Sequence, residues 1–225
     1  MRIGIIGAGH IGSTLARRLS ELGHRVIIAN SRGPASLSEI EAQTGASAVV
    51  VQDAGRGIDL AVLTIPMKGV PKLPAGLFAN LPANVPLIDT CNYYPRQRDG
   101  RIAEIEEGLP ESAWVERQIG HRVVKVFNNI YARHLADFGK EAGSPGRIAL
   151  PVAGDDPAAK AIVLTLVENL GFDALDAGPI AESWRQQPGT PAYCTDLGVA
   201  ALRRALAEAP RERTAEWRAT DKSPA

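Results

Sequence analysis

Residues 1–19, MRIGIIGAGHIGSTLARRL, contain three glycines in the spacing Gly7-x-Gly9-x-x-Gly12. The apolar run from Ile3 to Ile6 predicts a short buried strand, and leucines at helical spacing after the glycines predict an amphipathic helix. A strand, a glycine-rich turn and a helix in this order are typical of the phosphate-binding turn of a dinucleotide-binding fold. The spacing alone is a weak signal, and an ordinary strand-to-helix turn is the alternative.

Each glycine of the turn has a predicted role. Gly7 allows the tight turn, Gly9 lets the backbone approach a pyrophosphate, and Gly12 lets the helix pack closely on the strand. Backbone amides at the start of the helix would then face the phosphates. His10 is left with two roles, contact with a phosphate or exposure to solvent. The residues expected to bind the pyrophosphate are Gly7, Ala8, Gly9, His10, Ile11 and Gly12.

The tip of the next predicted strand, Arg25 to Ala29, is Asn30-Ser31-Arg32. Many dinucleotide-binding proteins place a carboxylate there, which binds a ribose hydroxyl pair and would repel a 2′-phosphate. This chain offers a hydroxyl and a guanidinium, which can bind phosphate. Each charge-assisted hydrogen bond contributes roughly 1.5–3 kcal/mol, so the tip predicts a preference for NADP over NAD of about 10- to 100-fold. A common loop composition is the alternative.

The rest of the chain alternates apolar strand-like runs with helical patterns. Runs rich in Val, Ile and Leu suit a parallel sheet covered on both faces, and the alternation suits a doubly wound α/β fold. We predict a Rossmann domain with a mostly parallel sheet over 1–180, and a short C-terminal helical extension of loop, helix and tail over 181–225. The tail, 210–225, is expected to fray. Further strands are expected at 48–51, 60–65, 86–90, 123–127, 148–153 and 172–176, and helices near 37–41, 157–170 and 194–208.

Composition excludes several classes of protein. The chain has 225 residues, and Lys+Arg and Asp+Glu are both 25, which argues against a nucleic-acid binder. No apolar stretch is long enough to span a bilayer and no signal-peptide cleavage pattern follows the first strand, so a cytoplasmic protein with no membrane partner is expected. Cys91 and Cys194, far apart, predict neither a disulfide scaffold nor a metal site.

Strand ends supply the remaining candidate residues, because ligands of a Rossmann sheet lie beyond the carboxyl ends of its strands. Pro66 either lies beside the nicotinamide or only stops its strand. The amide of Asn128 is expected to hold the nicotinamide carboxamide or the acceptor ring, unless it belongs to a polar turn. No acid–base pair is evident, so hydride transfer would depend on positioning, and no residue is assigned as catalytic. The strand-end candidates are Thr64, Ile65, Pro66, Thr90, Asn92 and Asn128.

Three further features carry expectations. Cys91 is expected to be a buried packing residue, since the sequence shows no base near it that could activate the thiol. Cys194 is expected to begin the last helix. The stretch 182–193, ESWRQQPGTPAY, is expected to cap an acceptor site or to pack on a partner subunit, because Trp and Tyr are costly to expose; a surface connection is the alternative. The histidines at 24, 121 and 134 are not expected to be catalytic.

The glycine turn, "NSR", "AVLTIP", "LIDTCNYYP" and "VVKVFNNI" together resemble the family of deazaflavin-coenzyme-dependent NADP oxidoreductases. The same set is similar to the NADPH-binding reductase domains of the membrane metalloreductases called STEAP. The resemblance covers about Met1 to Asp176 and implies a Rossmann domain that transfers a hydride between NADP and a flavin-like acceptor. Asn129 stands where these relatives more often have threonine. The stretch NYYPRQRDG is longer and more aromatic than the corresponding stretch of those relatives.

We therefore expect an NADP(H)-dependent oxidoreductase whose acceptor is a deazaflavin, FMN or FAD. The reduced acceptor could in turn pass electrons to ferric iron. Two alternatives stay open. The first is an NADP-dependent reductase of a small imine or carbonyl, a class that usually carries a longer helical C-terminal domain. The second is a non-catalytic sensor that binds NADPH without oxidising it. A homodimer is expected if the apolar positions Leu197, Ala200, Ala201 and Leu202 pack on a second subunit, although they fit packing on their own sheet equally well.

Overall fold

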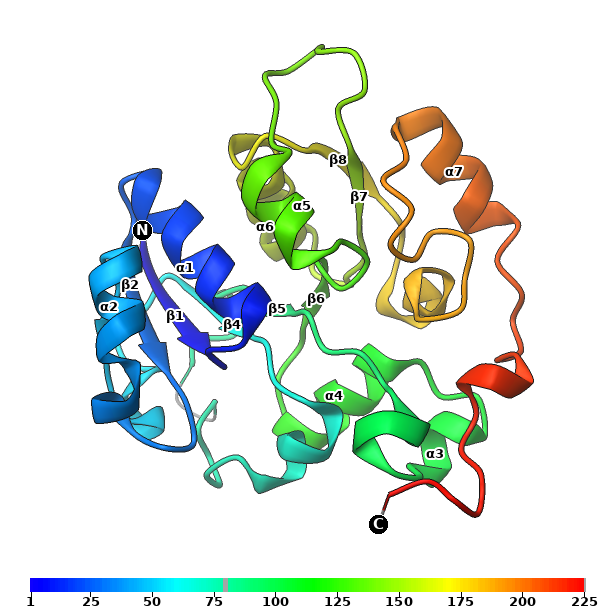
Figure 1. Ribbon diagram of the computed structural model, residues 1–225, viewed down its shortest axis with the longest axis horizontal. Coiled ribbons are helices and arrows are strands. Elements are labelled where there is room, and N and C mark those ends of the chain that lie inside the picture. The colour runs from blue at the N-terminus through cyan, green and yellow to red at the C-terminus, as the bar shows by residue number, and fades with distance from the viewer. Residues whose placement is uncertain (79–80, 225) are drawn as a thin grey trace.

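The computed structural model describes residues 1–78 and 81–224 and has an α/β fold built on a six-stranded parallel sheet (Figure 1). Its strands are β1 (Arg2–Ile6), β2 (Arg25–Ala29), β3 (Ser47–Ala48), β4 (Leu60–Leu63), β5 (Leu87–Asp89) and β6 (Val124–Lys125). They lie in the order β3-β2-β1-β4-β5-β6, and each neighbouring pair is parallel. This is the strand order of doubly wound dinucleotide-binding folds, so the predicted fold class is confirmed.

Helices cover both faces of this sheet. The α-helices of the described chain are α1 (His10–Glu21), α2 (Ser38–Thr44), α3 (Ala103–Glu106), α4 (Glu111–Ile119), α5 (Ala132–Asp137), α6 (Pro157–Asn169) and α7 (Val199–Ala207). Successive side chains of a strand point to opposite faces, and Ile5 and Ile6 of β1 accordingly belong to two separate apolar cores. Ile5 packs in the core that contains Leu19 of α1, and Ile6 in the core that contains Trp114 of α4.

Two strands of the chain stand apart from the main sheet. β7 (Ala149–Val152) and β8 (Asp173–Asp176) form a separate two-stranded parallel sheet. An antiparallel bridge between Lys125 and Ala153 joins it to β6. The parallel sheet therefore ends at β6, where the chain enters a left-handed conformation at Phe127, with φ of 61°. A bulky residue with positive φ is uncommon and marks a sharp change of direction.

The C-terminal helix begins later than predicted. Residues 194–198 are not helical, and Cys194 and Asp196 have φ values of 54° and 49°. The prediction that Cys194 begins this helix is therefore wrong, and α7 begins at Val199 instead. Leu202 and Leu206 of α7 pack in a core with residues of β7 and β8. Its apolar face therefore covers its own chain.

The tail after α7 is anchored, so the prediction that it frays is wrong for residues 211–219 (Figure 1, from orange to red). Arg213 makes an ion pair with Glu111, whose side chain is fully buried. Arg218 pairs with Glu106 at 3.4 Å, and Trp217 packs beside Tyr94 with ring centroids 5.9 Å apart. A buried carboxylate is costly without a cationic partner, and the tail supplies two such partners. Ala225 lies outside the described residues.

A buried ion pair fixes the end of β5 against β6. The Nζ of Lys125 lies 3.2 Å from Oδ2 of Asp89 and also donates to the Cys91 carbonyl, and both charged side chains are fully buried. The same carboxylate accepts hydrogen bonds from Ser112 Oγ at 2.6 Å and from the Cys91 amide at 2.8 Å. These bonds set the path of the chain just before the strand-end candidates Thr90 and Asn92.

Candidate functional site

The glycine turn has the close contacts that its predicted roles require. Gly7 has φ of 116°, and a side chain there would overlap the Thr64 carbonyl oxygen, with its Cβ 2.6 Å from the carbonyl carbon. A Cβ at Gly12 would lie 2.8 Å from Cγ2 of Thr64 and overlap the Gly7 carbonyl oxygen. No atom lies within 4 Å of a Cβ built on Gly9, so this backbone is open to a ligand. The turn therefore packs against β4 on one side and is open on the other.

The N-terminus of α1 is free to bind an anion. Gly9 is its N-cap residue and provides no side-chain hydrogen bond, and the first turn contains no acidic residue. Amides in the first turn of a helix have no intrahelical partner, and the helix dipole favours negative charge there. This end of α1, with the open backbone at Gly9, is suited to phosphate oxygens.

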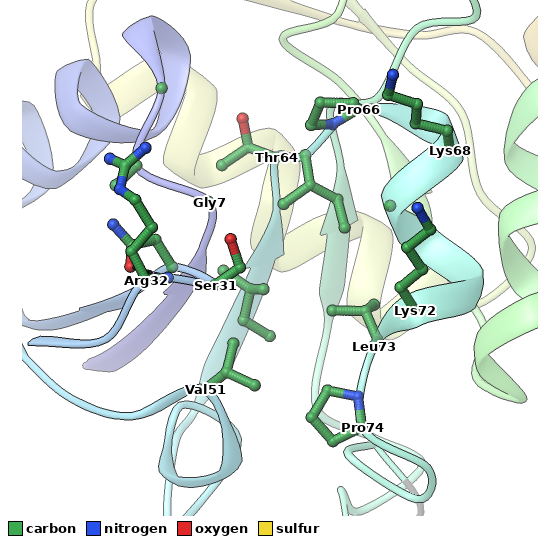
Figure 2. A pocket seen from close by; sticks show the side chains of 16 residues that line it. Gly7, Ser31, Arg32, Val51, Thr64, Pro66, Lys68, Lys72, Leu73 and Pro74 are labelled. Atoms are coloured by element: carbon green, nitrogen blue, oxygen red, sulfur yellow. Dashed lines mark hydrogen bonds between the residues drawn. The ribbon is translucent and has the colours of Figure 1, made fainter. Parts of the chain in front are cut away.

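A cleft of about 500 Å³ begins at this turn (Figure 2). It lies between the tip of β2, residues 30–32, and the segment after β4, residues 64–74. Ala8 and Gly9 of the glycine turn line it, whereas His10, Ile11 and Gly12 do not. His10 is exposed and Ile11 packs partly on the core. The structure thus brings the glycine turn, the β2 tip and the end of β4 together at one site.

The β2 tip is built as a turn that presents two side chains. The Asn30 carboxamide oxygen accepts a hydrogen bond from the Arg32 amide at 2.9 Å, and its nitrogen donates to Ser36 Oγ at 2.9 Å. Asn30 therefore shapes the turn, and its side chain is occupied within it. The guanidinium of Arg32 is exposed and forms neither a hydrogen bond nor an ion pair with any residue that the structure describes. Ser31 and Arg32 are the groups that a ligand would meet.

The opposite wall carries two lysines that the sequence analysis missed. The 3-10 helix Met67–Lys72 follows Pro66, and Figure 2 shows Lys68 and Lys72 on the other side of the cleft from Arg32. Both lysines are exposed, and neither pairs with a carboxylate of the described chain. The signal in the sequence is two lysines four positions apart directly after the strand-ending proline.

The charge of the cleft is therefore one-sided. Its lining includes the cations Arg32, Lys68 and Lys72, and no Asp or Glu is among the described residues that line it. The end near Val51 and Leu73 is apolar. Such a cleft attracts an anionic ligand and offers an apolar surface for a ring.

The strand-end candidates fall into two groups. Thr64, Ile65 and Pro66 line the cleft, and their contact with a nicotinamide stays a prediction. Thr90, Asn92 and Asn128 are not part of its lining. Thr90 is buried, and Asn92 and Asn128 are linked by a hydrogen bond of 3.1 Å between their amides.

The Asn128 amide is occupied by bonds within the protein. Its nitrogen donates to the Gln186 carbonyl at 2.7 Å, and its oxygen accepts from Gln186 Nε2 at 2.9 Å. Asn128 thus ties the segment after β6 to the 3-10 helix Ile180–Gln186, where the sequence predicts a loop. A contact of Asn128 with a nicotinamide stays a prediction, and it would require these bonds to be exchanged.

The thiol of Cys91 is not available as a nucleophile. Burial, followed by the charge of Asp89, raises the pKa of the Cys91 thiol well above its usual value, which keeps the thiol protonated and inert. Among the described residues, no group of His, Cys, Asp and Glu is arranged to hold a metal ion. Over the same part of the chain, none of the helices combines the length and apolarity that a membrane span needs.

Comparison with protein families gives one match over the N-terminal part of the chain. The model described as "NADP oxidoreductase coenzyme F420-dependent" matches residues 2–93, which include the glycine turn, the β2 tip and both lysines. Escherichia coli (strain K12) protein YjhV is 56% identical over 64 residues, 28% of this chain. The matched part spans 47% of the length of YjhV, so the chain covers about half of that relative.

Solved structures resemble the chain over most of its length. A hypothetical protein of Sinorhizobium meliloti is 29% identical with a TM-score of 0.72, and the match covers 88% of this chain and 95% of that one. A candidate F420-dependent NADP-reductase of Arthrobacter sp. FB24 is 28% identical with a TM-score of 0.67, covering 80% and 86%. A pyrroline-5-carboxylate reductase of Streptococcus pyogenes, 18% identical with a TM-score of 0.54 over 78% and 57%, shares the fold. The predicted resemblance to deazaflavin-coenzyme-dependent NADP oxidoreductases is confirmed over residues 2–93.

Proposed function

We propose that this chain binds NADP(H) in its cationic cleft and transfers a hydride between NADPH and a flavin-like acceptor. The match of residues 2–93 to the model of coenzyme F420-dependent NADP oxidoreductases supports this proposal. The pyrophosphate would lie at the glycine turn, against Gly9 and the first amides of α1. The 2′-phosphate would lie at Ser31 and Arg32, and the adenine at the apolar end near Leu73.

The observation that carries this proposal is the cationic lining of the cleft. An NAD site needs an acceptor for the ribose hydroxyls, and a carboxylate normally supplies it at the tip of the second strand. This cleft offers Ser31 and Arg32 at that tip and two further cations on the facing wall. Three unpaired positive charges balance most of the charge that a pyrophosphate and a 2′-phosphate bring.

A flavin-like acceptor suits a cleft whose described lining includes no Asp, Glu or His. Hydride transfer between two rings needs them stacked with the reacting carbons roughly 3–3.5 Å apart, and it needs no dedicated proton donor. Thr64, Ile65 and Pro66 would position the nicotinamide end of the coenzyme. The name of the matched family and that of the Arthrobacter neighbour favour a deazaflavin over FMN and FAD.

Replacing Arg32 with alanine tests the assignment of the 2′-phosphate. The change removes a charge-assisted clamp, so the affinity for NADPH should fall by about 10- to 100-fold. NADH lacks the 2′-phosphate, and its affinity should change by less than about threefold. Equilibrium titration with both coenzymes measures the two effects. The Arg133→Ala variant, which removes an exposed arginine of α5 outside the cleft, is the control and should bind both coenzymes as the unchanged protein does.

Equal losses for NADPH and NADH in the Arg32→Ala variant would show that the guanidinium does not read the 2′-phosphate. An unchanged affinity for NADPH would place the coenzyme elsewhere. Either result would overturn the assignment, because Arg32 is the cation at the β2 tip that lines the cleft.

A further inference from the structure

The stretch NYYPRQRDG, residues 92–100, follows β5 and contains a single π-helical turn, Pro95–Asp99. The Asp99 amide donates to the Tyr94 carbonyl at 3.0 Å, which is the i→i+5 bond of such a turn. Asp99 ends the turn, and its side chain is fully buried. None of these residues is among the described residues that line the cationic cleft, so a role at the site has to act through the residues that they contact.

The buried carboxylate of Asp99 joins two segments of the chain that follow neighbouring strands. Its Oδ1 atom accepts a hydrogen bond from the Lys68 amide at 3.3 Å, and its Oδ2 atom accepts one from the Tyr94 amide at 2.8 Å. Lys68 belongs to the wall of the cleft that follows β4, and Tyr94 to the segment that follows β5. One side chain therefore holds the cleft wall against the end of the next strand.

Arg98 completes this contact and extends it. Its Nε and Nη2 atoms donate to Oδ1 and Oδ2 of Asp99, each at 3.0 Å, so the guanidinium binds the carboxylate with both prongs. Nη2 also donates to the Asn92 carbonyl at 2.6 Å, and the Asn92 side chain is bonded to that of Asn128. The network thus runs from the segment after β4, through the segment after β5, to the segment after β6.

The two segments that Asp99 joins lie where the second half of a dinucleotide binds. In a doubly wound fold each half of the sheet binds one mononucleotide beyond the carboxyl ends of its strands. With the adenosine half at the β2 tip, the nicotinamide half falls to β4 and β5, on the other side of β1. Pro66 lies two residues before Lys68, and Asn92 two residues before Tyr94. The bonds of Asp99 therefore set the separation of the chain segments beside the nicotinamide ring.

We propose that Asp99 is a positioning residue, whose carboxylate fixes the segments after β4 and β5 so that the nicotinamide of bound NADPH is held in one orientation. The proposal rests on the proposed function, because it requires NADP(H) in the cleft. A carboxylate is needed there because each of its oxygens accepts from one backbone amide and one guanidinium nitrogen. Hydride transfer is sensitive to such positioning, since a displacement of about 1 Å can cost about 100-fold in rate.

The Asp99→Asn variant tests this role. Asparagine has the same shape, but its NH₂ group cannot accept, so one of the two backbone amides loses its partner and one segment is released. The fluorescence lifetime of reduced nicotinamide lengthens when the ring is immobilised. At saturating NADPH, this lifetime should therefore shorten toward that of free NADPH in the variant. The Kd of NADPH should change by less than about threefold, because the glycine turn and Arg32 bind the phosphates independently of Asp99.

A single turnover with a flavin-type acceptor gives a second measure, because it separates the rate constant of hydride transfer from its amplitude. The Asp99→Asn variant should lower the rate constant by about 10- to 100-fold at unchanged amplitude. An ion pair that only stabilises the fold would lower the amplitude, through the fraction of folded protein, and leave the rate constant as it is.

Two further variants complete the experiment. Arg98→Lys, at a side chain that is 35% exposed, is the milder change: it keeps the charge, loses the two-pronged contact and should shorten the lifetime in the same direction. Asp173→Asn is the matched control, because it weakens another aspartate–arginine pair, with Arg147 at 2.6 Å, outside the cleft lining. It should leave both the lifetime and the rate constant unchanged.

The lifetime needs no acceptor, so it judges the role of Asp99 separately from hydride transfer. A long lifetime of bound NADPH that shortens in Asp99→Asn would support the positioning role even if no acceptor were reduced, and only the proposed hydride transfer would then fail. A lifetime unaltered in both Asp99→Asn and Arg98→Lys, or shortened equally in Asp173→Asn, would overturn the positioning role. Bound NADPH with the lifetime of free NADPH in the unchanged protein would overturn it as well.

Discussion

The Gly7→Ala variant should lose NADPH binding beyond detection and lose about 3 kcal/mol of its free energy of unfolding. Strained backbone conformations cost roughly 1–3 kcal/mol, and overpacked side chains cost a similar amount. Both costs apply at Gly7, where φ is 116° and the new methyl group would overlap the Thr64 carbonyl. Relief of that overlap must separate the glycine turn from β4, and this movement disrupts the cleft. Urea denaturation and a coenzyme titration measure the two losses.

The Gly9→Ala variant is the matched control, two residues along the same turn. Its methyl group would meet no atom within 4 Å, and its φ of −80° suits any residue, so its stability should fall by no more than about 1 kcal/mol. The methyl group would nevertheless stand in the cleft where the pyrophosphate approaches, and NADPH affinity should fall. A Gly7→Ala protein as stable as Gly9→Ala would contradict the packing of this turn.

The Lys125→Met variant should lower the free energy of unfolding by about 3–5 kcal/mol, because it leaves the fully buried Asp89 carboxylate without its cation. The carbonyl of Cys91 would lose a donor in the same change. The effect is measured by urea denaturation. Lys72→Met, at an exposed lysine that pairs with no described carboxylate, should change stability by less than about 0.5 kcal/mol.

The double variant Lys125→Met with Asp89→Asn distinguishes loss of charge balance from loss of packing. Asparagine keeps one oxygen, which can accept from the Cys91 amide, and its NH₂ group can donate to Ser112 Oγ. It leaves no unpaired charge in the core. The double variant should therefore be more stable than Lys125→Met alone. A double variant that is no more stable would mean that the cost lies in packing and that the ion pair does not hold β5 to β6.

The glycine turn and the β2 tip could be predicted from the sequence because their geometry is local. The tight turn at Gly7 and the Asn30–Arg32 turn each depend on residues a few positions apart. The spacing of apolar residues predicts the strands and helices that flank these turns. The order of the main sheet follows from these same elements, because a doubly wound sheet has few permitted topologies.

The anchoring of the tail could not be predicted because its contacts are remote in sequence. Arg213 meets Glu111 across 102 positions, and nothing in the polar composition of residues 210–225 indicates that partner. The start of α7 was misplaced for a different reason. Left-handed conformations at Cys194 and Asp196, which are unusual for residues other than glycine, gave no sequence signal.

Asn128 shows a further limit of reading a site from sequence. An amide at a strand end has suitable chemistry for a nicotinamide, but β6 ends at Lys125, so Asn128 lies three positions beyond the strand. Whether the amide is available depends on Gln186, which occupies both of its polar atoms. The residue types could be recognised, but the partners that use them could not.

The most direct test of the proposed function is anaerobic consumption of NADPH by the purified protein, followed by absorbance with deazaflavin coenzyme, FMN, FAD and a panel of imines and aldehydes. We expect steady loss of NADPH only with a flavin-type acceptor, fastest with the deazaflavin, and at least about tenfold slower loss in the Arg32→Ala variant under subsaturating NADPH. Turnover with an imine or aldehyde alone would assign the cleft to a different reductase. Tight NADPH binding with no turnover by any acceptor would contradict the proposed hydride transfer and identify the chain as a coenzyme-binding sensor.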